Sequence, residues 1–203
     1  MRTIGITGGI GAGKSLVLSY IKEHYRAVVY EADNIAHLIK EPGQKCYEPL
    51  LRLLGRNVLN EDGRIDKGKR AERIFADPAL LQEVNAIIHP GVKEFVLTKI
   101  KEEDQRQDKD FFILEAALLI EEGYDKILDE LWYVRAEEEV RRKRLKEDRG
   151  YTEEKIGRIM KSQLQDEMFI KYCSLVIDNN GDPAQTYMQI DRKLGEYISA
   201  ESR

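Results

Sequence analysis

Short hydrophobic runs alternate along the chain with stretches whose hydrophobic residues recur at helical spacing. The runs are rich in β-branched and aromatic residues, and they lie at residues 3–7, 27–33, 111–116, 130–136 and 174–179. Continuous apolar runs are typical of strands that are buried on both faces of a parallel sheet. After the first run, Val17, Tyr20, Ile21 and His24 follow the period of an amphipathic helix. The alternation therefore predicts an α/β fold with helical crossovers between parallel strands.

Two of the segments between strands are longer than a simple crossover requires. Residues 34–110 and 137–173 both show helical patterns, and we expect them to form two helical insertions in one domain that spans residues 1–203. The core of that domain would fold as three α/β/α layers around a five-stranded parallel sheet. Its expected parts are residues 1–33, 111–136 and 174–203.

Local signals predict where several helices begin. A capping residue that is followed by proline, or that follows a turn, marks three helix starts: Asp77-Pro78, Thr152 after Arg149-Gly150, and Asp182-Pro183. His89-Pro90 predicts a helix break, because proline disfavours helical geometry in the residue before it.

Composition excludes several classes of partner. The formal net charge of −4 lacks the basic excess that is usual in nucleic-acid binders, so local basic groups must hold any anionic ligand. No apolar run approaches the roughly 18 to 20 residues that cross a bilayer, and the N-terminus lacks the pattern of a signal peptide. Cys46 and Cys173 are too few and too far apart for a disulfide framework. We therefore expect a cytoplasmic protein with reduced thiols.

A glycine-rich stretch between the first strand and the first helix carries the strongest chemical signal. Residues 8–15, GGIGAGKS, fit the pattern G-x-x-x-x-G-K-[ST] in its required context. Glycine lets backbone N–H groups turn inward around phosphate oxygens, and the helix N-terminus adds positive potential. Lys14 can reach the β- and γ-phosphates, and the Ser15 hydroxyl can bind Mg²⁺. The stretch predicts a nucleoside triphosphate site.

The other motifs favour a small-molecule kinase over a switch or a motor. A guanine-reading N-K-x-D motif is missing, and the D-x-x-G match at 178–181 follows the last strand, where a γ-phosphate sensor would not lie. The two insertions instead resemble an acceptor pocket and a lid that excludes water from the γ-phosphoryl group.

Acidic residues at strand ends are the candidates for proton transfer and metal binding. Asp33 ends the second run and could accept a proton from an attacking hydroxyl, help to arrange Mg²⁺, or simply cap the next helix. Glu31, two residues earlier, would point to the same side. Glu115 follows the third run and could hold a metal-bound water or be an ordinary strand-end carboxylate. The residues alone leave these alternatives open.

The charged run at 137–149 combines a solvated helix face with candidate lid arginines. Glu137, Glu138 and Glu139 stand four residues before Arg141, Arg142 and Lys143, a spacing that predicts exposed ion pairs. Of the remaining arginines, Arg144 and Arg149 are best placed to meet charge in a phosphoryl-transfer transition state.

An ordered set of motifs over almost the whole chain resembles the dephospho-coenzyme A kinase family. The set comprises GITGGIGAGKS (5–15), EAD (31–33), LGRNVLNEDGRIDK (54–67), HP (89–90), EAALLIE (115–121), RIMKSQ (158–163) and VIDNNG (176–181). The chain departs from the family pattern at five of these positions, which are Leu16, Glu31, Lys67, Glu115 and Ala117, and RLKEDR (144–149) has one more residue than the usual R-L-x-x-R.

The resemblance implies a P-loop kinase fold and transfer of the ATP γ-phosphoryl group, with Mg²⁺, to the ribose 3′-hydroxyl of dephospho-CoA. It implies catalytic roles for Asp33 as the base, Lys14, and Arg144 or Arg149. The implied ATP-binding residues are Gly9, Gly11, Ala12, Gly13, Lys14, Ser15, Leu16 and Asn179, the last near the adenine. The implied acceptor-binding residues are Asp33, His89, Leu118 and Glu121, and the implied metal ligands are Ser15 and Glu115.

The same resemblance assigns the two insertions and the partners. Residues 34–110 would bind the CoA moiety, and residues 137–173 would form the lid. The expected partners are ATP and dephospho-CoA, without nucleic acid or membrane, in a monomer or weak homo-oligomer. The alternatives are a P-loop kinase of another small acceptor, such as a nucleoside monophosphate, and a non-enzymatic nucleotide-binding switch.

Overall fold

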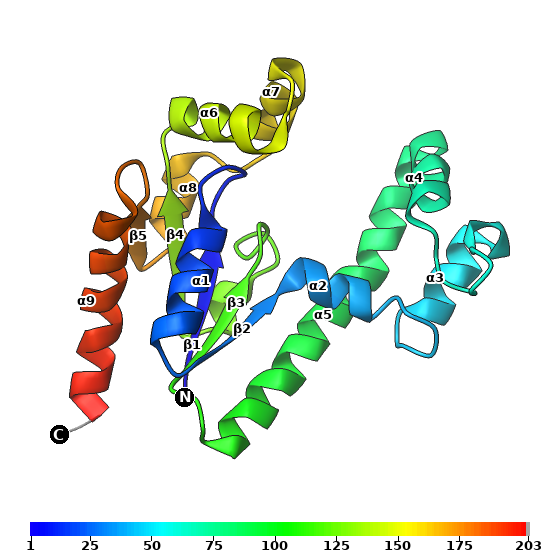
Figure 1. Ribbon diagram of the computed structural model, residues 1–203. Helices are drawn as coiled ribbons and strands as arrows, with labels where there is room; N and C mark the ends of the chain where they lie inside the picture. The colour runs from blue at the N-terminus through cyan, green and yellow to red at the C-terminus, as the bar shows by residue number, and fades with distance from the viewer. Residues whose placement is uncertain (202–203) are drawn as a thin grey trace. The chain divides into compact units, whose positions relative to one another are not determined.

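The computed structural model describes residues 1–201, which form two compact units (Figure 1). Unit 1 combines Met1–Val29 with the segment from Gln107 to the C-terminal helix, and unit 2 is the continuous segment Tyr30–Arg106. Unit 1 contains the phosphate-loop motif, and unit 2 contains Asp33 and His89.

A five-stranded parallel sheet forms the centre of the fold, as the hydrophobic runs predict. Its strands are β1 (Arg2–Thr7), β2 (Ala27–Glu31), β3 (Phe111–Glu115), β4 (Glu130–Arg135) and β5 (Leu175–Asp178). Their order is β2-β3-β1-β4-β5, so the first strand lies in the middle. β1 pairs in parallel with β3 and β4, placing Ile4 opposite Ile113 and Ile6 opposite Trp132. The four side chains are fully buried, which explains why the runs are apolar without alternation.

The helices of unit 1 cover both faces of the sheet. They are α1 (Lys14–His24), η2 (Tyr124–Lys126), α6 (Glu138–Arg149), α7 (Glu153–Lys161), α8 (Asp166–Tyr172) and α9 (Pro183–Glu201). α1 and α9 lie side by side (Figure 1), and their residues Val17, Ile21 and Ile190 join the core on one face. On the other face, Phe169 of α8 stacks on Tyr133 with ring centroids 4.5 Å apart. The three-layer α/β/α fold is confirmed.

Unit 2 is mainly helical, with the end of β2, a turn at residues 39–46 and a turn at residues 59–66 that is closed by a β-bridge between Leu59 and Ile65. Its helices are α2 (Ala32–Leu38), α3 (Tyr47–Leu54), η1 (Arg56–Val58), α4 (Lys67–Ala76) and α5 (Pro78–Arg106). The long helix α5 contacts α2, α3 and α4, and Val84, Val92 and Val96 of α5 are buried, as are Leu50 and Leu54 of α3. α5 therefore organises the other helices.

The helix break predicted at His89-Pro90 is wrong, because α5 continues through Pro90. Proline removes one backbone hydrogen bond and costs about 3 kcal/mol in a helix interior. Burial of Val84 and Val92 on either side favours the continuous helix. The next residue, Gly91, lies so close to Cys46 that an added Cβ would come within 2.5 Å of the thiol sulfur. Close packing thus outweighs the local preference of proline.

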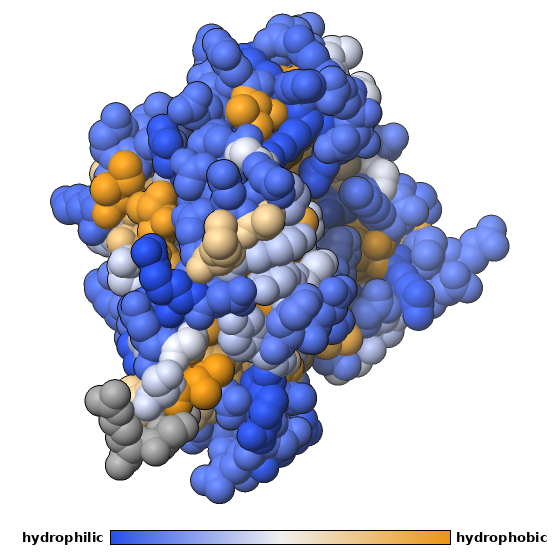
Figure 2. All heavy atoms as spheres, turned by 60° about the vertical axis from the view of Figure 1, so that its left-hand side comes forward, coloured by the Kyte–Doolittle hydropathy of each residue, from blue (hydrophilic) through white to orange (hydrophobic). Residues whose placement is uncertain are grey.

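The other predicted helix starts are confirmed. Thr152 caps α7 and accepts a hydrogen bond from the amide of Lys155, while Gly150 ends α6 with φ of 61°. α5 begins at Pro78 and α9 at Pro183. Among residues 1–201, no helix is both long and apolar enough to cross a membrane. On the face that Figure 2 shows, hydrophilic residues predominate and hydrophobic residues form small separate groups.

Candidate active site

The glycine loop between β1 and α1 has backbone geometry that only glycine adopts easily. Gly8 has φ of 148°, and an added Cβ would lie 2.4 Å from the carbonyl oxygen of Val134. Gly13, the N-cap of α1, has φ of 89°, and an added Cβ would lie 2.1 Å from the Asn179 amide nitrogen. Positive φ and the absence of a side chain are both required here, so these glycines shape the loop.

Lys14 and Glu115, two predicted site residues, meet at the C-terminal edge of the sheet. The Lys14 ammonium donates a hydrogen bond of 2.9 Å to the carbonyl oxygen of Gly8 and lies 3.4 Å from a Glu115 carboxylate oxygen. Each side chain is only 16% exposed. Ser15 follows in the first turn of α1 with its side chain exposed. A cation, a carboxylate and a hydroxyl are thus gathered beside the loop.

Asn179 and Arg144 support the loop from other elements. The side-chain amide of buried Asn179 donates a hydrogen bond of 2.7 Å to the carbonyl oxygen of Ala12, and its oxygen accepts one of 2.9 Å from the Thr186 hydroxyl. Arg144 donates a hydrogen bond of 2.8 Å to the carbonyl oxygen of Asn179 and longer ones to Gly11 and Ala12. The structure therefore brings both predicted residues to the loop.

Arg141 and Gln163 are loop contacts that sequence reasoning missed. Arg141 donates a hydrogen bond of 2.9 Å to the carbonyl oxygen of Ile10 and one of 2.7 Å to the side-chain oxygen of Gln163. The same Gln163 oxygen accepts a hydrogen bond of 3.1 Å from the Ile10 amide. Burial lowers the pKa of Arg141, against the opposing effect of Tyr133. A desolvated cation therefore lies at the loop.

The predicted solvated ion pair of Arg141 with Glu137 is wrong, because the guanidinium turns to Ile10. The same pattern is right for the next position, where Arg142 lies 2.6 Å from Glu138. Gln163 stands in the motif RIMKSQ, and that motif was the only sequence signal that could have singled it out.

The remaining predicted residues of unit 1 lie at its surface. Arg149 is exposed at the last residue of α6. Leu118 and Glu121 are exposed in the segment that follows β3, and Leu118 is 45% exposed. None of the three reaches the glycine loop through a described hydrogen bond or ion pair within residues 1–201, so their roles in binding or catalysis remain predictions.

The prediction that Asp33 ends the second strand is wrong, because β2 already ends at Glu31. Asp33 does not cap a helix either: α2 begins at Ala32 with Glu31 in the N-cap position, and Asp33 lies exposed in the first helical turn. The strand alternation that would point Glu31 and Asp33 to one side is therefore absent. His89 lies half-buried inside α5. The substrate contacts predicted for these residues, and the roles of 34–110 and 137–173, remain predictions.

Comparison with known proteins places this geometry in a family. The model of the family described as Dephospho-CoA kinase matches residues 2–185. The chain belongs to the dephospho-CoA kinase family. A dephospho-CoA kinase from Aquifex aeolicus (strain VF5) is 37% identical over 198 residues, which cover 97% of each chain. One from Corynebacterium glutamicum is 33% identical over 199 residues, which cover 98% of each chain.

Solved structures are similar over the same extent. The structure of TT1252 from Thermus thermophilus matches with a TM-score of 0.78 at 29% identity, covering 96% of this chain and 97% of that one. A dephospho-CoA kinase from Campylobacter jejuni matches over the full length of both chains with a TM-score of 0.71 at 20% identity, and therefore supports the fold alone.

Proposed function

We propose that the protein transfers the γ-phosphoryl group of ATP to the ribose 3′-hydroxyl of dephospho-CoA, giving coenzyme A, the last step of coenzyme A synthesis. The observation that carries this proposal is family membership over residues 2–185, which include an intact glycine loop with Lys14 beside Glu115. The alternative, a P-loop kinase that phosphorylates a nucleoside monophosphate, is not supported by a comparable family match.

On the ATP side, the chain supplies positioning and positive charge, which are the main contributions of a protein to phosphoryl transfer. Loop amides at the N-terminus of α1 would donate to the β-phosphate. Lys14 would exchange its hydrogen bond to Gly8 for the β- and γ-phosphates. The half-buried guanidinium of Arg141 and that of Arg144, already held at the loop, would stabilise charge on the transferred group. Arg149 is the less supported lid arginine because it is exposed at the end of α6.

The residues beside the loop fit a Mg²⁺ ion that arrives with ATP. Mg²⁺ keeps several waters and binds through one or two protein oxygens together with substrate phosphates. The described residues contain no cluster of three or more metal-ligating side chains, in keeping with such a sparse site. Ser15 would bind the ion directly, and Glu115 would hold its water shell. When bound, Mg²⁺ neutralises charge on the phosphates.

On the acceptor side, Asp33 would take the proton from the 3′-hydroxyl. Its carboxylate is exposed in the first turn of α2, so it is open to a substrate hydroxyl. A carboxylate that accepts this proton contributes about 10²–10⁴ in rate. His89, Leu118 and Glu121 would contact the acceptor.

The proposed setting is the cytoplasm, where ATP and a reducing environment are available. Cys46 and Cys173 are both free thiols, which fits that compartment. We propose a monomer or weak homo-oligomer.

A coupled assay of ADP release with ATP and Mg²⁺ tests the function. Dephospho-CoA is compared with a panel of nucleoside monophosphates, and the product is identified by mass. Turnover with dephospho-CoA that yields coenzyme A is the expected result. Turnover only with another acceptor would contradict the proposed substrate while leaving the phosphate loop intact.

A further inference from the structure

A pocket in unit 2 is lined by more positive than negative charge. It is a shallow, solvent-open pocket that lies where α2 and the turn after it meet the residues around the start of α4. We call it the basic pocket, and its lining residues are His37, Lys40, Glu41, Ile65, Lys67 and Arg70.

The positive charges of the basic pocket are only partly offset within the unit. Its single carboxylate, Glu41, is paired with Arg64 at 3.0 Å. Among residues 1–201, no carboxylate forms an ion pair with Lys40, Lys67 or Arg70. Burial, and next the charge of Arg70, lowers the pKa of Lys40 to about 8. Cations are therefore held together at an electrostatic cost that a bound anion would relieve.

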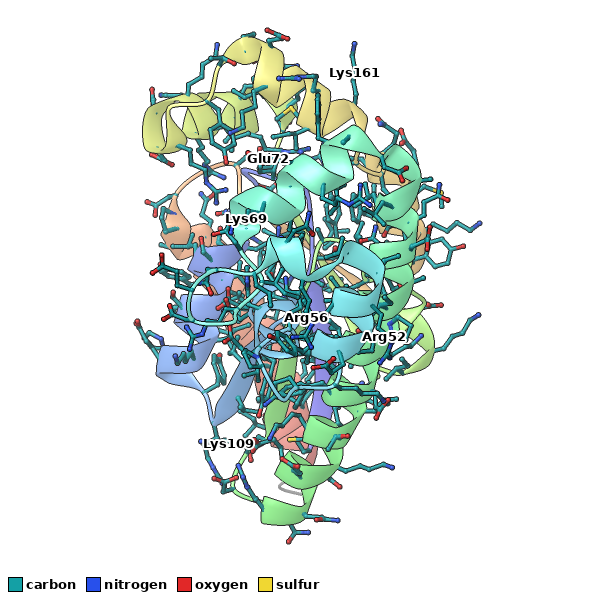
Figure 3. All side chains as sticks on the ribbon, turned by 90° about the vertical axis from the view of Figure 1, so that its right-hand side faces the viewer. Arg52, Arg56, Lys69, Glu72, Lys109 and Lys161 are labelled. Carbon is teal, nitrogen blue, oxygen red and sulfur yellow. The ribbon has the colours of Figure 1, made fainter. Side chains whose placement is uncertain are left out.

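Local contacts fix the position of these cations. Asp66 caps α4 and accepts a hydrogen bond of 2.8 Å from the amide of Lys69. The Lys69 side chain, labelled on α4 in Figure 3, donates a hydrogen bond of 2.6 Å to the carbonyl oxygen of Leu59. α4 is thus attached to the preceding turn, and Lys67 and Arg70 are presented from an anchored first turn rather than from a free loop.

The basic pocket adjoins the proposed catalytic base. Asp33 and His37 are four residues apart on α2, so their side chains lie on the same face of the helix. The Asp33 carboxylate also favours the charged forms of His37 and Lys40, which places its charge within electrostatic reach of both. An anion in the pocket would consequently lie about one helical turn from Asp33.

We propose that the basic pocket, through Lys40, Lys67 and Arg70, binds the diphosphate of the acceptor and so presents the attached ribose to Asp33. This inference rests on the proposed function. In dephospho-CoA the diphosphate is joined to the same ribose that carries the acceptor 3′-hydroxyl. Each phosphate of the diphosphate bears one negative charge. Lysine and arginine side chains neutralise such a group, and the planar guanidinium of Arg70 can form two hydrogen bonds with one phosphate. An acceptor without the diphosphate would lose this contact.

The test uses the full-length protein and three charge-removing variants. Lys40→Gln and Arg70→Gln each remove one pocket cation, while Arg73→Gln removes an exposed cation one turn further along α4 and is the matched control. Calorimetry measures binding of dephospho-CoA with a non-hydrolysable ATP analogue present, so the dissociation constant does not depend on turnover. Thermal unfolding of all proteins is recorded in parallel.

Each pocket variant should weaken dephospho-CoA binding roughly 10- to 100-fold, the loss expected for one charge-assisted hydrogen bond. Arg73→Gln should bind like the wild type, and affinity for the ATP analogue should not change. Unchanged dephospho-CoA affinity in folded Lys40→Gln and Arg70→Gln proteins would overturn the proposal, as would an equal loss in Arg73→Gln. Wild-type turnover, assayed separately, tests the proposed function, so the two can fail independently.

Discussion

The side-chain amide of Asn179 donates a hydrogen bond of 2.7 Å to the carbonyl oxygen of Ala12, so a residue that follows β5 holds the glycine loop that follows β1. The Thr186 hydroxyl donates to the other end of the same amide and fixes its orientation. Asn179 is buried, so its hydrogen bonds are not shared with solvent. The loop is therefore shaped by a distant part of the sequence as well as by its own glycines.

Asn179→Asp should disrupt this support. The substitution replaces the N–H donor with a carboxylate oxygen that faces the Ala12 carbonyl, and a buried acceptor left unpaired costs about 1–3 kcal/mol of unfolding free energy. The KM for ATP should rise roughly tenfold, which corresponds to about 1.4 kcal/mol. Denaturant unfolding and steady-state kinetics measure the two effects. Asn57→Asp, at an exposed position, is the control, and equal effects in both variants would contradict this account.

Gln163→Glu should stabilise the protein and yet weaken ATP binding. A carboxylate at this position would form an ion pair with Arg141 and a charge-assisted hydrogen bond with the Ile10 amide, which both now bind the Gln163 oxygen. The added negative charge would also repel the phosphates of ATP, and the carboxylate would keep the Ile10 amide from donating to them. We expect a higher Tm and a roughly tenfold higher KM for ATP.

Gln165→Glu adds the same charge at an exposed position two residues away and controls for long-range repulsion. A rise in Tm without any change in the KM for ATP would show that the Gln163 side chain does not compete with phosphate.

Asp33→Asn should abolish most phosphoryl transfer and preserve ATP binding. The amide cannot accept the proton from the acceptor hydroxyl, so kcat should fall about 10²–10⁴-fold. Calorimetric titration with the ATP analogue should give the wild-type dissociation constant. Asp62→Asn changes another exposed carboxylate of unit 2 and should leave kcat unaltered. Near-normal turnover of Asp33→Asn would exclude it as the base.

Glu130 should make the folded state sensitive to acid. Its side chain, 7% exposed, accepts hydrogen bonds from Arg2 at 2.8 Å, from Trp132 at 3.0 Å, and from Ser174 and Tyr197. Burial alone would raise the pKa of Glu130, but the hydrogen bonds outweigh burial and lower it below 4.5. Because the pKa of Glu130 is lower in the folded state than in the unfolded state, ionised Glu130 stabilises the fold at pH values above its unfolded-state pKa. This stabilisation is lost as the pH falls through the folded-state pKa.

Glu130→Ala should therefore cost about 3 kcal/mol at neutral pH, chiefly because it leaves the N–H of buried Trp132 without its acceptor. The difference from the wild type should shrink as the pH falls below the ordinary value of 4.5. Urea unfolding across this pH range provides the measurement, with exposed Glu167→Gln as control. A difference that stays constant down to low pH would mean that Glu130 stabilises the fold by packing alone.

The strands and the glycine loop were predictable because each signal is local. Buried parallel strands require continuous apolar runs, such as TIGIT before the loop, and Gly8 and Gly13 meet a backbone requirement that few other residues can meet. The cap at Thr152 and the helix start at Pro183 are likewise encoded within a few residues.

The errors arose where distant contacts override local preference. The spacing of Arg141 favours a pair with Glu137, but Ile10 and Gln163 offer partly buried partners that no local pattern encodes. At Pro90, packing of α5 against its neighbours maintains the helix. Asp33 occupies a helical turn because β2 ends two residues earlier than its apolar run suggests, and strand ends depend on neighbouring strands.

The central position of β1 has a consequence for synthesis of the chain. β1 is made before its partner strands, and Ile4 pairs with Ile113 of β3 and Glu130 of β4, which are made only after all of unit 2. Unit 2 is one continuous segment and can complete its own contacts earlier. We expect nascent chains to carry a folded helical segment while the apolar strand β1 is still exposed and unpaired. We therefore expect β1 to be a binding site for chaperones during translation.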